Sequence, residues 1–162
     1  MNTAEISNAL ATLLGELVEG APKEGGYMLN PGDEGLLRSL EKLPASDASA
    51  QTLTGSSIAA HVDHLRYGLS LMNRWSGGES PFGSADWSAS WRKTSVTEPE
   101  WKDRISELRA EAARWLAAVR QPREVDDVEL NGMIGSIAHL AYHLGAIRQI
   151  NKSVRGPAEG TK

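Results

Sequence analysis

The sequence predicts an all-α fold: a four-helix bundle that runs up-down-down-up, with a long crossover between the second and third helices. Apolar residues recur at spacings of three and four, which is typical of amphipathic helices, and no stretch alternates like a half-buried strand. All four histidines fall in two of the helical segments. The second and fourth helices must face each other if these histidines are to meet, which favours the up-down-down-up order.

The first helix is expected over Thr3–Glu19, where one apolar stripe repeats at helical spacing: Ile6, Leu10, Leu13 and Leu17. The segment after it is dense in Gly and Pro and predicts a connection. "LLRSLEKLP" then predicts a short helical turn or two ended by Pro44.

The second helix is expected within residues 54–78, because serines and threonines are available as N-caps and Gly77-Gly78 can end it. Its apolar side holds Ile58, Val62, Leu65, Leu69 and Met72. Residues 77–97 lack a sustained period but carry three large aromatic side chains, Phe82, Trp87 and Trp91. That much aromatic surface predicts an ordered crossover packed on the bundle.

The third helix should begin at the capping-box pattern Thr97-Glu98-Pro99-Glu100. Its apolar stripe is the most regular in the chain: Trp101, Ile105, Leu108, Ala112, Trp115 and Val119. The fourth helix is expected from roughly Met133 to Lys152. Residues 1–152 then form a single domain, and residues 153–162 a solvated C-terminal tail.

Composition limits the functions that remain open. A chain of 162 residues with a net charge of −4 has no basic field for nucleic acid or anionic lipid. The N-terminus has no basic region and carries Glu5 and Glu16, so it predicts neither a signal peptide nor a membrane span. The absence of cysteine agrees with a cytoplasmic location and leaves nitrogen and oxygen as the only metal ligands.

The histidines predict a metal site. His139 and His143 lie four residues apart and can direct both rings to one point beside the core. His61 is favoured as the third ligand because it flanks Val62 on the inward side. His64 is then an alternative ligand or a neighbour just outside the ligand set. Three imidazoles and a water are typical of a catalytic metal site. The competing interpretation is that the HxxxH pattern arose by chance and that its rings only form hydrogen bonds.

The residues near the histidines limit the chemistry. Leu140 stands where a zinc peptidase would have its glutamate, which disfavours peptidase activity. A base could come from metal-bound hydroxide, from the substrate or from Asp63, although Asp63 is expected to be a solvated or supporting carboxylate. Tyr142 is expected to be a packed ring and Arg148 a surface or interface cation.

Several of these features together resemble the DinB-like, or YfiT-like, metalloenzyme superfamily. They are "SIAAHVDHLRYGL" in the second helix, the long crossover, and "HLAYHLGAIRQI" with His139, His143 and Gly145. The resemblance covers nearly the whole chain in element order. It implies a four-helix bundle, a homodimer, and nickel or zinc held by His61, His139 and His143. It also implies transfer reactions that use mycothiol, bacillithiol or glutathione.

Two functions are therefore expected to compete. The first is a divalent-metal-dependent enzyme that activates a thiol cosubstrate or water, for transfer to or hydrolysis of a small molecule in a pocket roofed by residues 77–97. Any thiol must be a cosubstrate because the chain has no cysteine. The alternative is a non-catalytic metal-binding dimeric bundle with a stress-related or regulatory role.

Overall fold

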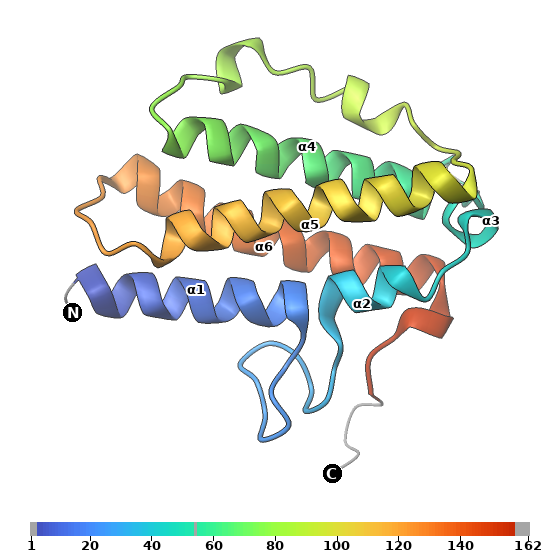
Figure 1. Cartoon of the computed structure of the whole chain (residues 1–162), viewed down its shortest axis with the longest axis horizontal. Helices are drawn as coiled ribbons and strands as arrows, with labels where there is room; N and C mark the ends of the chain where they lie inside the picture. The colour runs from blue at the N-terminus through green and yellow to red at the C-terminus, as the bar shows by residue number, and fades with distance from the viewer. Residues whose placement is uncertain (1–2, 54, 158–162) are drawn as a thin grey trace.

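A computed structural model describes residues 3–53 and 55–157, and within these ranges the protein is helical with no strand (Figure 1). The described chain forms six α-helices and three short 3₁₀ helices. The predicted all-α class is confirmed for these residues. No helix among them is both long enough and apolar enough to cross a membrane.

Four long helices make up most of the molecule: α1 (Thr3–Glu19), α4 (Ile58–Ser76), α5 (Glu98–Arg120) and α6 (Asp127–Ile150). α5 and α6 each pack against both α1 and α4. The colour gradient in Figure 1 shows that α1 and α6 run in one direction and that α4 and α5 run in the other. Consequently α4 and α6 are antiparallel neighbours, which decides which of their side chains meet.

Two short helices lie between α1 and α4. α2 (Gly35–Glu41) packs against α1 and α5, and α3 (Ala45–Ala48) contacts α4 and α5. The predicted short helical segment before Pro44 corresponds to α2. α3 begins directly after Pro44, whose backbone is extended and whose carbonyl accepts from the Ala48 amide at 3.1 Å.

Side-chain caps begin the helices where the sequence predicted them. The Ser57 hydroxyl accepts from the Ala60 amide at 3.2 Å and so caps α4. Thr97 and Glu100 form a reciprocal capping box at the start of α5. Each cap satisfies amides that a helix N-terminus leaves without an intrahelical partner.

α6 begins six residues earlier than the expected start near Met133, which corrects that boundary. Its N-cap is Asp126, whose carboxylate accepts from the Glu129 amide at 2.8 Å. Gly132 does not end a connection but lies inside the helix. A Cβ atom there would lie 2.5 Å from Cζ3 of Trp75, so the glycine permits close packing of α6 against the end of α4.

The core lies between the long helices and includes two fully buried tryptophans, Trp101 and Trp115. The Trp115 indole N–H donates to the Ser136 hydroxyl at 2.9 Å, which links α5 to α6.

The beginning of the expected solvated tail is part of the core. Residues 152–154 form a 3₁₀ helix, and Val154 is only 3% exposed. This burial corrects the expectation for the start of the tail. Residues 158–162 of that tail lie outside the described residues.

The crossover of residues 77–97 runs along the outer side of α4 (Figure 1). It contains two 3₁₀ helices, η1 (Phe82–Ser84) and η2 (Ala89–Trp91), and η2 packs directly on α4. The Asp86 amide donates to the Tyr67 hydroxyl at 3.0 Å, and the Ser57 hydroxyl donates to the Thr94 carbonyl at 2.7 Å. These two bonds therefore hold the crossover on α4 at its middle and near its C-terminal end.

Candidate metal centre

All four histidines meet in one cluster between α4 and α6. α4 contributes His61 and His64, and α6 contributes His139 and His143. His61, His64 and His143 are buried, and His139 is partly exposed. Residues three or four apart share a helix face, so each helix can present both of its rings to the other helix.

The antiparallel directions of α4 and α6 determine the pairing of the rings. His61 lies level with His143, and their Nδ1 atoms are 2.7 Å apart. His64, one turn further along α4, lies level with His139, and their Nε2 atoms are 3.0 Å apart. The Nε2 atoms of His139 and His143 are separated by 2.9 Å. One nitrogen atom from each of His64, His139 and His143 therefore converges on a single point, with all three within 4.8 Å of one another.

His61 takes a different position from the one that the sequence favoured. Its Nδ1 atom contacts Nδ1 of His143, whereas the other ring nitrogen of His143, Nε2, faces His139. His64 is the α4 histidine that groups with His139 and His143. The sequence indicated both His61 and His64 as candidates. The structure brings both to the cluster, where His61 contacts His143 and His64 contacts His139.

The hydrogen-bond network determines the tautomer of His64. The Ser90 hydroxyl donates its one proton to the Trp87 carbonyl at 2.7 Å, so it can only accept from His64 Nδ1, which lies 2.8 Å away. A neutral His64 consequently carries its proton on Nδ1 and a lone pair on Nε2. That lone pair is directed at the Nε2 atom of His139.

The three converging Nε2 atoms fit a divalent metal. Without an ion, at least one of them must carry a proton to avoid lone pairs facing one another at 2.9–3.0 Å. Tetrahedral nitrogen ligands about 2.0–2.1 Å from zinc are themselves about 3.4 Å apart, so the His64–His139 and His139–His143 pairs need to separate by only a few tenths of an ångström. The donor set is nitrogen alone, which suits zinc or nickel rather than calcium or magnesium.

Burial keeps the imidazoles neutral. It lowers the pKa of His143 to about 3, assisted by the neighbouring His139, His61 and His64. Burial also lowers the pKa of His64 to about 4, with smaller lowering effects from His139 and His61 and an opposing effect from Asp63. The pKa values of His61 and His139 are lowered by burial as well. The neutral ring is the form that binds a metal, so the cluster is in its metal-binding state near pH 7.

Two tryptophans of the crossover pack against the cluster. The Trp91 ring stacks on His64 with centroids 4.4 Å apart and meets the edge of His61 at 5.1 Å. Trp87 lies 5.7 Å from the rings of both His64 and Tyr67. As the sequence predicted, these aromatic residues attach the crossover to α4, and they also cover one side of the histidines.

A cavity of about 350 Å³ adjoins the cluster. His64 and His139 form part of its wall, and Phe82 and Trp87 of the crossover form another part. A small molecule in this cavity would therefore lie against two of the three converging histidines.

Other polar residues near the cluster have structural partners. The Asp63 carboxylate is buried rather than solvated; it accepts from Arg66 at 3.0 Å and pairs with Arg104 of α5 at 3.2 Å. Arg148 differs from its expectation, since it forms a largely buried pair with Asp33 at 2.6 Å. Tyr142 also differs, because its side chain is 71% exposed and only the edge of its ring contacts His143.

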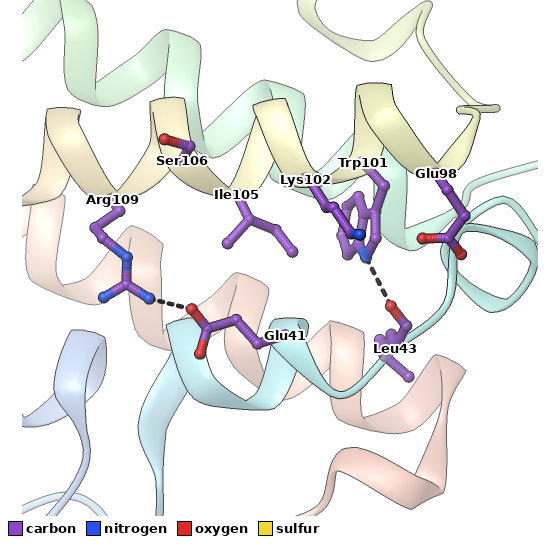
Figure 2. Close-up of a pocket in the computed structure, with 8 residues that line it drawn as sticks. All are labelled: Glu41, Leu43, Glu98, Trp101, Lys102, Ile105, Ser106 and Arg109. Carbon is purple, nitrogen blue, oxygen red and sulfur yellow. Dashed lines mark hydrogen bonds and ion pairs between the residues drawn. The ribbon is translucent and has the colours of Figure 1, made fainter.

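A second cavity of about 350 Å³ lies between α2 and α5, and none of the four histidines lines it (Figure 2). Within it the Trp101 indole donates to the Leu43 carbonyl at 2.8 Å, and Arg109 pairs with Glu41. Glu98 accepts from the Ala45 amide at 2.7 Å. These groups connect α2 and α3 to α5, so their polar atoms are engaged in holding the fold.

Fold and site together define an all-helical protein whose four histidines converge between two antiparallel helices, beside a cavity. Comparisons with protein-family models, with curated proteins and with solved structures find no match to this chain.

Acid is expected to destabilise the metal-free protein. The folded-state pKa values of the histidines lie below the unfolded value of about 6.5, so protonation favours the unfolded state. Stability should be greatest above pH 6.5 and fall on acidification, by up to about 1.4 kcal/mol per pH unit for each histidine that remains neutral. Urea unfolding of chelator-treated protein between pH 7 and pH 5 measures this slope. His143→Gln should flatten it, and a flat profile for the unsubstituted protein would contradict the expectation.

Proposed function

We propose that this protein is a divalent-metal-dependent enzyme of the DinB-like type, which holds zinc or nickel through His64, His139 and His143. The observation that carries the proposal is the convergence of one ring nitrogen from each of these three histidines, all within 4.8 Å of one another, beside a cavity. A bound metal of this kind supplies a thiolate or hydroxide nucleophile near neutral pH. The substrate is a small molecule, and a thiol used in the reaction comes from a cosubstrate, since the chain has no cysteine.

Two further residues orient the proposed ligands. The Ser90 hydroxyl accepts from Nδ1 of His64 and holds its Nε2 lone pair toward the cluster. His61 lies against Nδ1 of His143 at 2.7 Å and can accept its proton, which leaves the Nε2 lone pair of His143 available. Metal-binding histidines usually donate their other N–H to such a partner, and the partner sets both the tautomer and the angle of the ring.

The proposal also covers the fold: the protein is a four-helix bundle that belongs to the DinB-like superfamily. The four long helices pack in a ring of neighbours, α1 with α5 and α6, and α4 with α5 and α6. Their directions in Figure 1 match an up-down-down-up order, and the long crossover between α4 and α5 supports the DinB-like assignment. Within this assignment the bundle is a cytoplasmic protein.

A homodimer is part of the same proposal, and the outer side of α6 supports it. Ile134, Ala138 and Tyr142 follow one another at four-residue spacing and are exposed, with Ile134 at 49%. No charged residue occurs in α6 between Glu129 and Arg148. An apolar helix face of this kind is typical of an interface between subunits.

Sedimentation should give a mass in solution of twice the chain mass of 17.5 kDa. Ile134→Glu should lower this mass toward that of one chain, because it places a charge on the apolar face. A monomer of the unsubstituted protein at micromolar concentration would contradict the dimer.

The ligand assignment predicts distinct effects for the two histidines of α4. Protein purified without a histidine tag should bind one zinc or nickel per chain, measured by elemental analysis and chelator competition. His64→Ala, His139→Ala and His143→Ala should each abolish stoichiometric binding. His61→Ala should weaken binding by about 10- to 100-fold because it removes only a supporting contact. His61→Gln, which keeps a hydrogen-bond acceptor, should recover part of the loss.

Glu79→Gln is the control, since Glu79 pairs with Arg74 at the exposed end of α4 and should not alter metal affinity. If His61→Ala abolishes binding while His64→Ala retains it, the ligand set is His61, His139 and His143, as the sequence favoured. Full metal retention by His139→Ala would refute a metal centre built on this cluster.

Thiol-dependent turnover tests the enzymatic part of the proposal. The zinc- or nickel-loaded protein is incubated with glutathione, mycothiol or bacillithiol and an electrophilic aromatic chloride, and free thiol is titrated over time. Consumption should exceed the uncatalysed rate, require the metal and disappear in His139→Ala. An apolar ester tests hydrolysis in parallel. Stoichiometric metal without turnover in any of these assays would favour a non-catalytic, metal-binding dimer with a regulatory or stress-related role.

A further inference from the structure

The cavity beside the histidine cluster has a nearly continuous apolar wall. Side chains of α4, α6 and the crossover surround it, and its volume is about 350 Å³. An apolar cavity of about 150 Å³ binds benzene, so this one has room for a molecule of one or two rings. Its apolar side chains are Leu65, Leu69, Met72, Phe82, Trp87 and Leu140.

The cavity offers a ligand no charge, and its polar groups other than the histidines are already engaged. None of its described lining residues is acidic, lysine or arginine. Its one hydroxyl, on Ser136, donates to the Met133 carbonyl at 2.7 Å and accepts from Trp115 at 2.9 Å. In the metal-free protein a charged ligand would lose its hydration here without gaining a partner of opposite charge, which strongly disfavours its binding.

Glycines on both helices keep the cavity open. A Cβ atom on Gly68 of α4 would lie 3.7 Å from both His139 Cε1 and Trp87 Cζ3, so a longer side chain there would extend between these two rings. A Cβ atom on Gly135 of α6 would meet nothing within 4 Å. Glycine inside a helix costs roughly 0.5–1 kcal/mol relative to alanine, and at these two positions it provides space for a ligand.

We propose that this cavity binds the apolar body of a small uncharged substrate of one or two rings, with its reacting group against His64 and His139. The inference rests on the proposed function for the reaction itself, whereas binding of the apolar body requires no metal. It adds a substrate class: a neutral aromatic or alicyclic molecule rather than an acid, a phosphate or a sugar. The partly exposed rings of Phe82 and Trp87 form the crossover's side of the cavity.

The experiment compares two probes that share one ring system and differ in charge. 1-Naphthalenemethanol and 1-naphthalenesulfonate are titrated into the full chain by calorimetry, with and without stoichiometric zinc. In the titration without zinc, the neutral probe should bind at least about tenfold more tightly than the sulfonate, a difference of about 1.4 kcal/mol. Amide resonances of Gly68, Leu69 and Gly135 should shift with the neutral probe.

A matched pair of glycine variants on α6 locates the binding. Gly135→Leu should fill the cavity and weaken binding of the neutral probe at least about tenfold. Gly145→Leu is the control: a Cβ atom there also meets nothing within 4 Å, but Gly145 does not line this cavity. Both variants make the same residue change within one helix, so both should fold, and Gly145→Leu should bind within about twofold of the unsubstituted protein.

Equal affinity for the two probes, or unchanged binding in Gly135→Leu, would overturn the inference. The two proposals fail separately. Stoichiometric zinc without binding of the neutral probe contradicts the substrate class and leaves the metal centre. Binding of the neutral probe without stoichiometric zinc supports the cavity and contradicts the metal-dependent function.

Discussion

The antiparallel packing of α4 on α6 is the constraint on which the site depends. It places His61 level with His143 and His64 level with His139, so the four rings form one connected network rather than two separate pairs. If the helices were parallel, His61 would instead be level with His139. The same packing forms two walls of the cavity, because the helix faces that carry the histidines continue toward Gly68 and Gly135.

The cluster is costly to the fold when its imidazoles are protonated. Four imidazoles lie together, and the Asp63 carboxylate nearby is taken up by Arg66 and Arg104. Burial lowers all four pKa values, and the rings further lower the pKa values of His64 and His143. Without an ion, the contacts among the nitrogens of His64, His139 and His143 depend on protons that these rings carry. A divalent cation satisfies all three at once, so binding would be coupled to folding stability.

The helices could be predicted from local patterns, and the contacts between them could not. The bounds of α1 and the capping box of α5 follow from residues adjacent in sequence. The predicted start of α6 near Met133 is too late: glycine is unfavourable inside a helix, yet Gly132 lies within α6 and accommodates Trp75 from another helix. The choice between His61 and His64 depends on how α4 is rotated against α6. Both residues border the apolar stripe of α4, and their spacing alone does not decide which ring meets His139.

The connection between α4 and α5 links the fold to the chemistry. Because these helices run in the same direction, the chain must travel back along the molecule, and this path takes it past the histidines (Figure 1). Along that path Ser90 accepts from His64, Trp91 stacks on the same ring, and Trp87 forms part of the cavity wall. One segment therefore orients a proposed metal ligand, covers it and shapes the adjoining space. The crossover that the topology requires thus supplies the side of the site that neither α4 nor α6 can provide.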